Sequence, residues 1–237
     1  GGINISRALK KLGIASEAII LSGGYTGKTL EALLTKEQVD FTAITTEGDT
    51  RENFVVFDED KKLQYRFGMP GESVSNQELG LLMQAIGNCS HADYIVVSGS
   101  LPPGTANSVF HEIAIIAEQL NAKLIIDTSG EALKAAVKEG LYLIKPNLRE
   151  LASLVGKEWI AISDVIATAR EVIAAGSCKA MAVSMGADGA MLITATEHFQ
   201  AVAPKAPVLS TVGAGDSMVA GMLAALTKGW GWEQVLQ

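Results

Sequence analysis

The stretch Tyr94-Ile95-Val96-Val97-Ser98 is followed, after a helical pattern over Thr105–Leu120, by a second apolar run, Lys123-Leu124-Ile125-Ile126-Asp127. Short continuous apolar runs of this kind predict strands that helices cover on both faces. A strand, a helix and a strand in this order predict two parallel strands joined by a right-handed crossover. Residues 94–127 therefore indicate an α/β fold built around a parallel sheet.

The same alternation continues on both sides of this stretch. Further strands are predicted at Ala18–Leu21, Leu141–Ile144 and Ala180–Ser184, and a strand pair at Ala190–Thr194 and Phe199–Ala203. Further helices are predicted at Thr26–Leu34, Asn76–Gly87, Gly130–Lys138 and Ser163–Ala175. Repeated units of a strand and a helix favour a mostly parallel sheet with helices packed on its faces.

One block interrupts the alternation. Phe41–Thr46, Arg51–Phe57 and Leu63–Phe67 are three extended segments with no helical pattern between them. The polar run Asp58-Glu59-Asp60-Lys61 between the last two is typical of a hairpin turn. Such a block does not suit a parallel sheet, so we expect a small antiparallel flap at residues 41–70.

These patterns divide the chain into a discontinuous α/β core, residues 1–40 and 71–237, and the β flap. The length of 237 residues suits one large domain with such an addition. The chain opens on Gly1-Gly2 and stops within a helical pattern at Gln237, so we expect it to be truncated at both ends.

The composition excludes several classes of protein. Hydrophobic residues make up 48% of the chain and charged residues 19%, which excludes an intrinsically disordered protein. The net charge of −7 argues against an electrostatic nucleic-acid binder. The longest apolar runs fall far short of the roughly 20 residues of a membrane span. Two cysteines cannot build a disulfide framework, so we expect a cytoplasmic protein. Three scattered histidines lack metal-ligand spacing, which excludes a structural zinc site.

The strongest functional signal is the run Ser210-Thr211-Val212-Gly213-Ala214-Gly215-Asp216-Ser217, which leads into a helical pattern over Met218–Leu226. Small residues let the backbone approach a ligand, and the N–H groups of a first helical turn attract a phosphate or a developing oxyanion. Asp216 could there take a proton from an attacking hydroxyl. A tight loop in which Asp216 only caps the helix fits the local sequence equally well.

A second run, Gly24-Tyr25-Thr26-Gly27-Lys28-Thr29, resembles part of a phosphate-binding P-loop. A P-loop requires a glycine five positions before Gly27, where this chain has Ser22. A glycine turn that leads into a helix at Thr29–Leu34 explains the run better, so a P-loop NTPase is disfavoured.

The run Lys145-Pro146-Asn147-Leu148-Arg149-Glu150 follows a predicted strand and opens a helix. Asn147 and Glu150 are three residues apart, on one helical face, and their oxygens could hold a hydrated magnesium ion. The same pair matches a capping box, in which Asn147 caps the helix and Glu150 reaches back. The two functions are compatible.

Three other segments are candidate ligand contacts. Ser98–Gly104 follows a predicted strand, at the sheet edge where α/β proteins bind ligands, although a plain turn fits it equally well. Gly1-Gly2-Ile3-Asn4 combines glycines for close approach with an amide that can donate and accept hydrogen bonds. Arg51 in the flap could clamp a phosphate or lie solvated on the surface.

Five segments occur in the order seen in the ribokinase-like (PfkB) carbohydrate kinases, and the sequence resembles this family over essentially its whole length. They are Gly1-Gly2-Ile3-Asn4, Ser98–Gly104, Lys145-Pro146-Asn147-x-x-Glu150, Ser184-Met185-Gly186-x-x-Gly189 and Thr211-Val212-Gly213-Ala214-Gly215-Asp216. Within the family, the opening glycines, Gln64–Gly71 and Asp127–Leu133 are most similar to the type-2 bacterial 6-phosphofructokinases. The resemblance implies a ribokinase-like α/β/α sandwich with a mostly parallel sheet and a small β lid.

The resemblance also implies a role for each matching residue. Asp216 would be the catalytic base, and the anion hole would be formed by Gly213, Ala214 and Gly215. The sugar ligands would be Gly1, Gly2, Asn4 and Ser100, with Arg51 on the 6-phosphate. The nucleotide ligands would be Lys145, Asn147, Ser184, Gly186, Ser210 and Thr211. The Mg²⁺ ligands, acting through water, would be Asn147 and Glu150.

The implied enzyme is a homodimer, formed through the β lid, that uses ATP to phosphorylate fructose 6-phosphate at its 1-hydroxyl to fructose 1,6-bisphosphate. Kinases of the same family for tagatose 6-phosphate or fructose 1-phosphate are alternatives, as is a non-catalytic phosphosugar-binding protein on the same fold. In the family, a first strand with a sugar-binding Asp lies upstream of the position of Gly1, and a segment beyond Gln237 closes over adenine. No nucleic-acid or membrane partner is expected.

Overall fold

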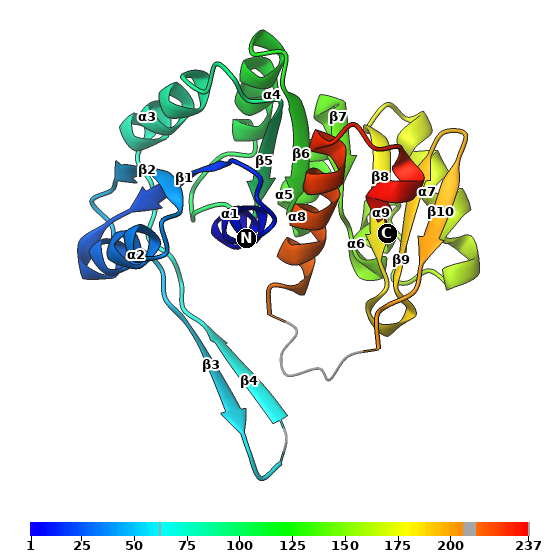
Figure 1. Ribbon diagram of the computed structural model, residues 1–237, viewed down its shortest axis with the longest axis horizontal. Coiled ribbons are helices and arrows are strands. Elements are labelled where there is room, and N and C mark those ends of the chain that lie inside the picture. The colour runs from blue at the N-terminus through cyan, green and yellow to red at the C-terminus, as the bar shows by residue number, and fades with distance from the viewer. Residues whose placement is uncertain (62, 206–211, 237) are drawn as a thin grey trace. The chain divides into compact units, whose positions relative to one another are not determined.

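The computed structural model describes residues 1–61, 63–205 and 212–236 (Figure 1). The chain divides into two compact units. The first comprises Gly1–Ser16, Cys89–Ser100 and Asn107–Gln237, and the second comprises Glu17–Asn88 and Leu101–Ala106. This division groups residues 17–40 and 71–88 with the predicted flap, whereas the sequence pattern groups them with the core.

The first unit is built around a six-stranded sheet with the strand order β10-β9-β8-β7-β6-β5. Its strands are β5 (Tyr94–Ser98), β6 (Lys123–Asp127), β7 (Leu141–Ile144), β8 (Cys178–Ser184), β9 (Ala190–Thr194) and β10 (His198–Ala201). Strands β5 to β8 run parallel, and β9 and β10 are antiparallel to their neighbours. The mostly parallel α/β sheet is therefore confirmed.

Helices cover both faces of this sheet (Figure 1). One layer contains α1 (Gly2–Lys11), α8 (Ala214–Thr227) and α9 (Trp232–Leu236), and the other contains α4 (Val109–Gln119), α5 (Gly130–Ala136), α6 (Leu148–Leu154) and α7 (Val165–Ala174). The unit is an α/β/α sandwich, as the resemblance implies. No helix in the described part of the chain combines the length and the apolar character needed to cross a membrane.

Strand β6 shows why a continuous apolar run predicts a strand that helices cover on both faces. Leu124, Ile125 and Ile126 are almost fully buried. Successive side chains of a strand point to opposite faces of the sheet. Ile125 joins the core formed with α1 and α8, so its two neighbours face the other helix layer. Both faces of the strand are buried, and a continuous apolar run results.

Helix α4 begins at Val109 and not at the predicted Thr105. Gly104 adopts a left-handed conformation with a φ of +77°, and the N–H of Thr105 donates to the carbonyl of Pro102 at 3.2 Å. These residues close a turn after β5. The helix can start only after the chain has left this turn.

In the second unit, β1 (Glu17–Ser22) and β2 (Asp40–Thr45) form a parallel pair joined by α2 (Gly24–Lys36), with α3 (Asn76–Gly87) packed against both strands. The prediction that Phe41–Thr46 belongs to an antiparallel flap was wrong. A helix between two strands carries the chain back along the sheet, so that the second strand runs parallel to the first.

Strands β3 (Asn53–Asp58) and β4 (Leu63–Gly68) form the antiparallel hairpin that the sequence predicts. The Asp58 carboxylate supports its turn by accepting hydrogen bonds from the N–H groups of Asp60 and Lys61, at 3.1 and 2.9 Å. A short polar side chain that binds backbone two or three residues further on is a common turn device.

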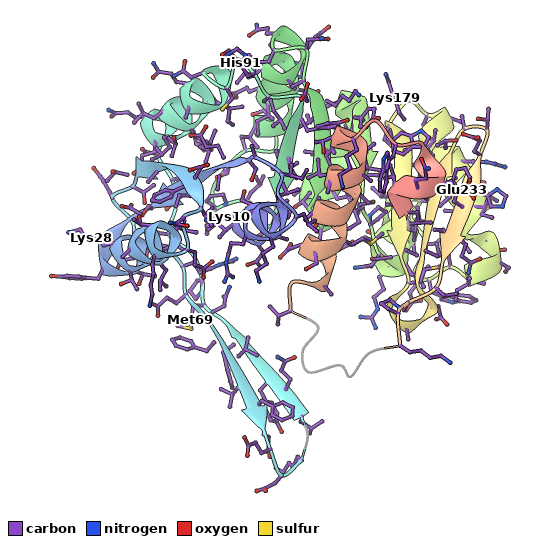
Figure 2. All side chains as sticks on the ribbon, in the orientation of Figure 1. Lys10, Lys28, Met69, His91, Lys179 and Glu233 are labelled. Carbon is purple, nitrogen blue, oxygen red and sulfur yellow. The ribbon has the colours of Figure 1, made fainter. Side chains whose placement is uncertain are left out.

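The ribbon of β3 and β4 has two different faces, and Figure 2 shows side chains projecting from both. Residues that are paired across an antiparallel ribbon share a face. The register therefore places on one face, here called the apolar face, the side chains of Phe54, Val56, Leu63, Tyr65 and Phe67. Each of these is between 42% and 54% exposed. The other face carries Val55 and Phe57, with the polar Gln64 opposite Phe57.

Candidate active site

Helix α8 is preceded by Gly213, its N-cap residue. Gly213 has a φ of +79°. This left-handed conformation favours glycine. Asp216 is therefore not the N-cap residue of α8; it lies in the first turn of the helix, two residues after Ala214. The first N–H groups of a helix have no partner within it and attract an anion. Ser210 and Thr211 lie outside the described residues.

The Asp216 carboxylate is held by a residue far away in the sequence. Nδ2 of Asn4 donates a hydrogen bond to Oδ2 of Asp216 at 2.8 Å, although 212 residues separate the two. Asn4 lies in the first turn of α1, and α1 packs against α8. Asp216 is only partly buried, as a residue that meets a substrate must be. The structure therefore brings together two motifs that the sequence analysis found separately.

Gly1 fits between Asp216 and the end of β5. A Cβ atom on Gly1 would collide with the hydroxyl of Ser98 and would lie 3.1 Å from Oδ1 of Asp216. The missing side chain lets the backbone pass close to the carboxylate. Ser98 opens the Ser98–Gly104 segment that the sequence analysis names as a candidate ligand contact, and the structure places it next to Gly1. Gly2 begins α1, and Ser100 is exposed just beyond β5.

A buried ion pair lies beside the start of α8. Nζ of Lys145 is 3.1 Å from Oδ1 of Asp127. Burial raises the pKa of Asp127; the Lys145 charge opposes this shift, and the Asp216 charge adds to it. Nζ of Lys145 also lies 3.1 Å from the place where a Cβ atom of Gly215 would be. Lys145 thus reaches the glycine loop, and Asp127 is a site residue that the motifs did not assign.

Asn147 and Glu150 form a capping box at the start of α6. Oδ1 of Asn147 accepts the N–H of Glu150 at 2.9 Å, and Oε2 of Glu150 accepts the N–H of Asn147 at 2.8 Å. The capping function is therefore confirmed. Both side chains keep further oxygen lone pairs, which suit a magnesium ion that retains most of its waters and also binds substrate phosphates. The described residues contain no cluster of three His, Cys, Asp or Glu side chains able to hold a metal ion alone.

Ser184 and Gly186 lie at the carboxyl end of β8, next to the start of α6. The N–H of Ser184 donates to the carbonyl of Pro146 at 2.9 Å, and Ser184 forms an isolated bridge with Asn147. Gly186 has a φ of +64° and begins a short 3₁₀ turn, Gly186–Asp188. Together with Lys145, these residues gather at the carboxyl ends of neighbouring parallel strands, where α/β sheets bind ligands.

Two candidate phosphate contacts lie in the second unit. The start of α2 is closed by its own unit, because the N–H of Gly23 donates to Oγ1 of Thr50 at 3.0 Å and the Asp49 carboxylate fills the space beside Gly24. This helix start therefore does not form a P-loop. The sequence analysis disfavours a P-loop here for a different reason, the missing glycine at position 22. Arg51 follows in the same segment, and its role as a ligand of the sugar phosphate stays a prediction.

The chain matches known proteins along its whole length. The family model described as pfkB family carbohydrate kinase matches residues 1–237. The chain is 37% identical over 238 residues to ATP-dependent 6-phosphofructokinase isozyme 2 of Escherichia coli K12, covering 100% of this chain and 77% of that protein. It is 32% identical over 227 residues to 1-phosphofructokinase of Bacillus subtilis strain 168, covering 96% and 74%.

A solved structure supports the same relationship. Phosphofructokinase-2 from Escherichia coli in complex with fructose-6-phosphate matches this structure with a TM-score of 0.93 and 37% identity, over 100% of this chain and 78% of that one. The sandwich fold, the order of the motifs and the family match all agree. The chain therefore belongs to the PfkB family of carbohydrate kinases.

Proposed function

We propose that this ATP-dependent kinase phosphorylates fructose 6-phosphate at its 1-hydroxyl to give fructose 1,6-bisphosphate. One observation carries the proposal: the carboxylate of Asp216, in the first turn of α8, accepts a hydrogen bond from the Asn4 side chain. A base, an anion-attracting helix start and the buried ammonium of Lys145 lie within one compact unit. Similarity to a 6-phosphofructokinase over the whole chain supports the choice of sugar.

In this mechanism the 1-hydroxyl oxygen attacks the γ-phosphorus of ATP. The bond from that phosphorus to the β,γ-bridging oxygen breaks, and its electron pair leaves on ADP. Asp216 accepts the hydroxyl proton as the new bond forms. The N–H groups of Gly213, Ala214 and Gly215 stabilise the negative charge on the transferring group. Phosphoryl transfer requires mainly positioning and charge neutralisation, so the glycine loop and Asp216, together with Mg²⁺, would form a sufficient catalytic set.

The nucleotide would lie along the carboxyl ends of β7 and β8, where an ammonium, an amide, a hydroxyl and an exposed glycine backbone gather. Its proposed ligands are Lys145, Asn147, Ser184, Gly186, Ser210 and Thr211. Asn147 and Glu150 would hold a hydrated Mg²⁺, which when bound supplies positive charge to the phosphates.

The sugar would contact the Gly1–Asn4 segment and Ser100, and Arg51 would bind its 6-phosphate. The amide of Asn4 has two N–H groups and one carbonyl oxygen. It can therefore keep its bond to Asp216 and still bind a sugar hydroxyl. This arrangement would align the attacking oxygen with the base.

Turnover with a panel of phosphosugars tests the substrate. Fructose 6-phosphate, fructose 1-phosphate and tagatose 6-phosphate are each supplied with ATP and Mg²⁺ to the full-length natural protein, and ADP release is measured. We expect the highest kcat/KM with fructose 6-phosphate. A higher value with fructose 1-phosphate would instead assign the activity named for the Bacillus subtilis relative.

We also propose that a second copy of this chain covers the apolar face of the ribbon. A contiguous set of half-exposed apolar side chains marks an interaction surface, and a two-stranded hairpin is only marginally stable alone. The ribbon would also serve as the lid that the family resemblance implies. Cys89 and Cys178 are free thiols, which suits the cytoplasmic location that we propose.

A further inference from the structure

The buried pair of Asp127 and Lys145 requires an explanation beyond stability. The two side chains are only 16% and 8% exposed, and 3.1 Å separates Oδ1 from Nζ. Charges removed from water lose hydration that their mutual attraction repays only in part, and apolar side chains of similar size often stabilise a fold equally well. A pair of this kind therefore points to a function of its charges.

The sheet fixes the backbone on both sides of the pair. Asp127 ends β6, and Lys145 directly follows its neighbour β7. The N–H of Lys145 donates to the carbonyl of Ile126 at 3.3 Å, and the N–H of Gly99 donates to the carbonyl of Asp127 at 3.0 Å. The base of each side chain is therefore held at the same edge of the sheet.

The lysine side chain, in contrast, is long and flexible, and its ammonium can occupy many places. In the structure Nζ lies 3.1 Å, and Cε 3.5 Å, from the position that a Cβ atom on Gly215 would take. Gly215 belongs to the first turn of α8, next to Asp216 in sequence. The ammonium therefore lies at the helix start that would receive the transferring phosphoryl group.

We propose that Asp127 is a positioning residue, which holds the Lys145 ammonium beside Gly215 so that it meets the transferring phosphoryl group. The inference rests on the proposed function, because it requires a phosphoryl group at the start of α8. Without Asp127, the ammonium would be free to pair with the Asp216 carboxylate. Such a pair would oppose proton acceptance by the base and would remove positive charge from the phosphate.

A double-mutant cycle on the full-length natural protein tests this inference. The variants are Asp127→Asn, Lys145→Met and the combination of both, and kcat is measured together with the KM values for fructose 6-phosphate and for ATP. Glu131→Gln serves as the control, because it breaks an exposed ion pair, in which Nζ of Lys134 lies 2.9 Å from Oε1 of Glu131. Thermal unfolding of each variant reports its stability separately.

We expect Asp127→Asn to lower kcat roughly 10- to 100-fold, because displacing a charge by about 1 Å can cost that much. The KM for the sugar should change less than kcat. In the Lys145→Met background the same substitution should change kcat less than about twofold, since Asp127 acts only through the lysine. Glu131→Gln should retain the kcat of the unmodified protein.

Equal losses from Asp127→Asn in both backgrounds, or a kcat that it leaves unchanged, would overturn the inference. If Asp127→Asn does not fold, Asp127→Glu keeps the charge but moves it, and its kcat loss must likewise vanish in the Lys145→Met background. An unmodified protein that turns over no phosphosugar would overturn the proposed function together with this inference. An active enzyme with additive variants would overturn the inference alone.

Discussion

Two glycines of α8 differ in what surrounds them. A Cβ atom on Gly215 would lie 3.1 Å from Nζ of Lys145, whereas a Cβ atom on Gly221 would have nothing within 4 Å. We expect Gly215→Ala to displace the ammonium and to lower kcat roughly 10-fold or more. Gly221→Ala should keep its activity and gain about 0.5–1 kcal/mol of stability, because alanine favours a helix interior. Steady-state kinetics and urea unfolding of the two variants check this, and equal kinetics for both would contradict it.

In the proposed mechanism, Asp216 is the residue that takes part in the chemistry most directly. Asp216→Asn keeps the shape of the side chain but cannot accept the hydroxyl proton. We expect kcat to fall by at least ~10²-fold while ATP still binds. Asp164→Asn, at the start of α7 and outside the site, is the matched control. Retention of near-normal turnover by Asp216→Asn would remove this carboxylate from the mechanism.

Asn4 should matter for the orientation of the base. Asn4→Leu has a similar shape but lacks the amide that donates to Oδ2 of Asp216 at 2.8 Å. Loss of a hydrogen bond to a charged group should lower kcat/KM roughly 10- to 100-fold. Lys11→Ala, on an exposed part of α1, should have no such effect. Kinetics of the two variants, with circular dichroism to verify folding, test the expectation.

At the scale of elements, α3 begins with a capping box that depends on pH. The Ser75 side chain accepts the N–H of Glu78 at 3.3 Å, and Glu78 accepts hydrogen bonds from the hydroxyl and the N–H of Ser75 and from the N–H of Glu47. These bonds lower the pKa of Glu78 below its ordinary value of 4.5. A carboxyl group with a lowered pKa stabilises the fold above its unfolded-state pKa, and this contribution is lost as pH falls through the folded-state pKa.

We therefore expect Glu78→Gln to lower the urea midpoint at pH 7. The difference from the unmodified protein should shrink as the pH falls below the ordinary value of 4.5. Glu118→Gln on the exposed side of α4 is the control and should show no such trend. A difference that stays constant between pH 7 and pH 3 would contradict the assignment.

The bounds of a helix or strand could be predicted from the sequence where a single local pattern determines that element. The apolar runs at β5, β6 and β7 match the strand bounds, and in β6 burial on both faces explains the unbroken apolar pattern. Phe41–Thr46 was misassigned because its apolar residues do not reveal which strand they pair with. The start of α4 was missed because the turn at Gly104 breaks a pattern that is otherwise helical.

At the scale of the whole molecule, the ribbon should determine assembly. Val56→Glu places a charge in the middle of the apolar face, whereas Val55→Glu places it on the other face. A charge without a partner in a buried interface is costly, so we expect Val56→Glu to weaken the dimer roughly 100-fold or more. Val55→Glu should remain dimeric. Sedimentation measurements check this, and a monomeric unmodified protein, or equal behaviour of both variants, would contradict it.

The sequence motifs name residues that the structure brings together in the candidate site, but they do not predict the contacts between these residues. The glycine loop, Asp216, Asn4 and Lys145 were all identified by motif, but Asn4 was expected only to hold the sugar. Its bond to Asp216 depends on how α1 packs against α8, which no local pattern reveals. The contact of Asp127 with Lys145 depends in the same way on β6 and β7 being neighbours.

The hydrogen bond between Asn4 and Asp216 has a consequence for protein synthesis. It joins the first turn of α1 to a helix that leaves the ribosome 212 residues later. Until that helix emerges, a nascent chain has the Asn4 amide but not the carboxylate that it binds. In the proposed mechanism, catalytic competence is therefore acquired late in translation, and unfinished polypeptides cannot consume nucleotide by this route.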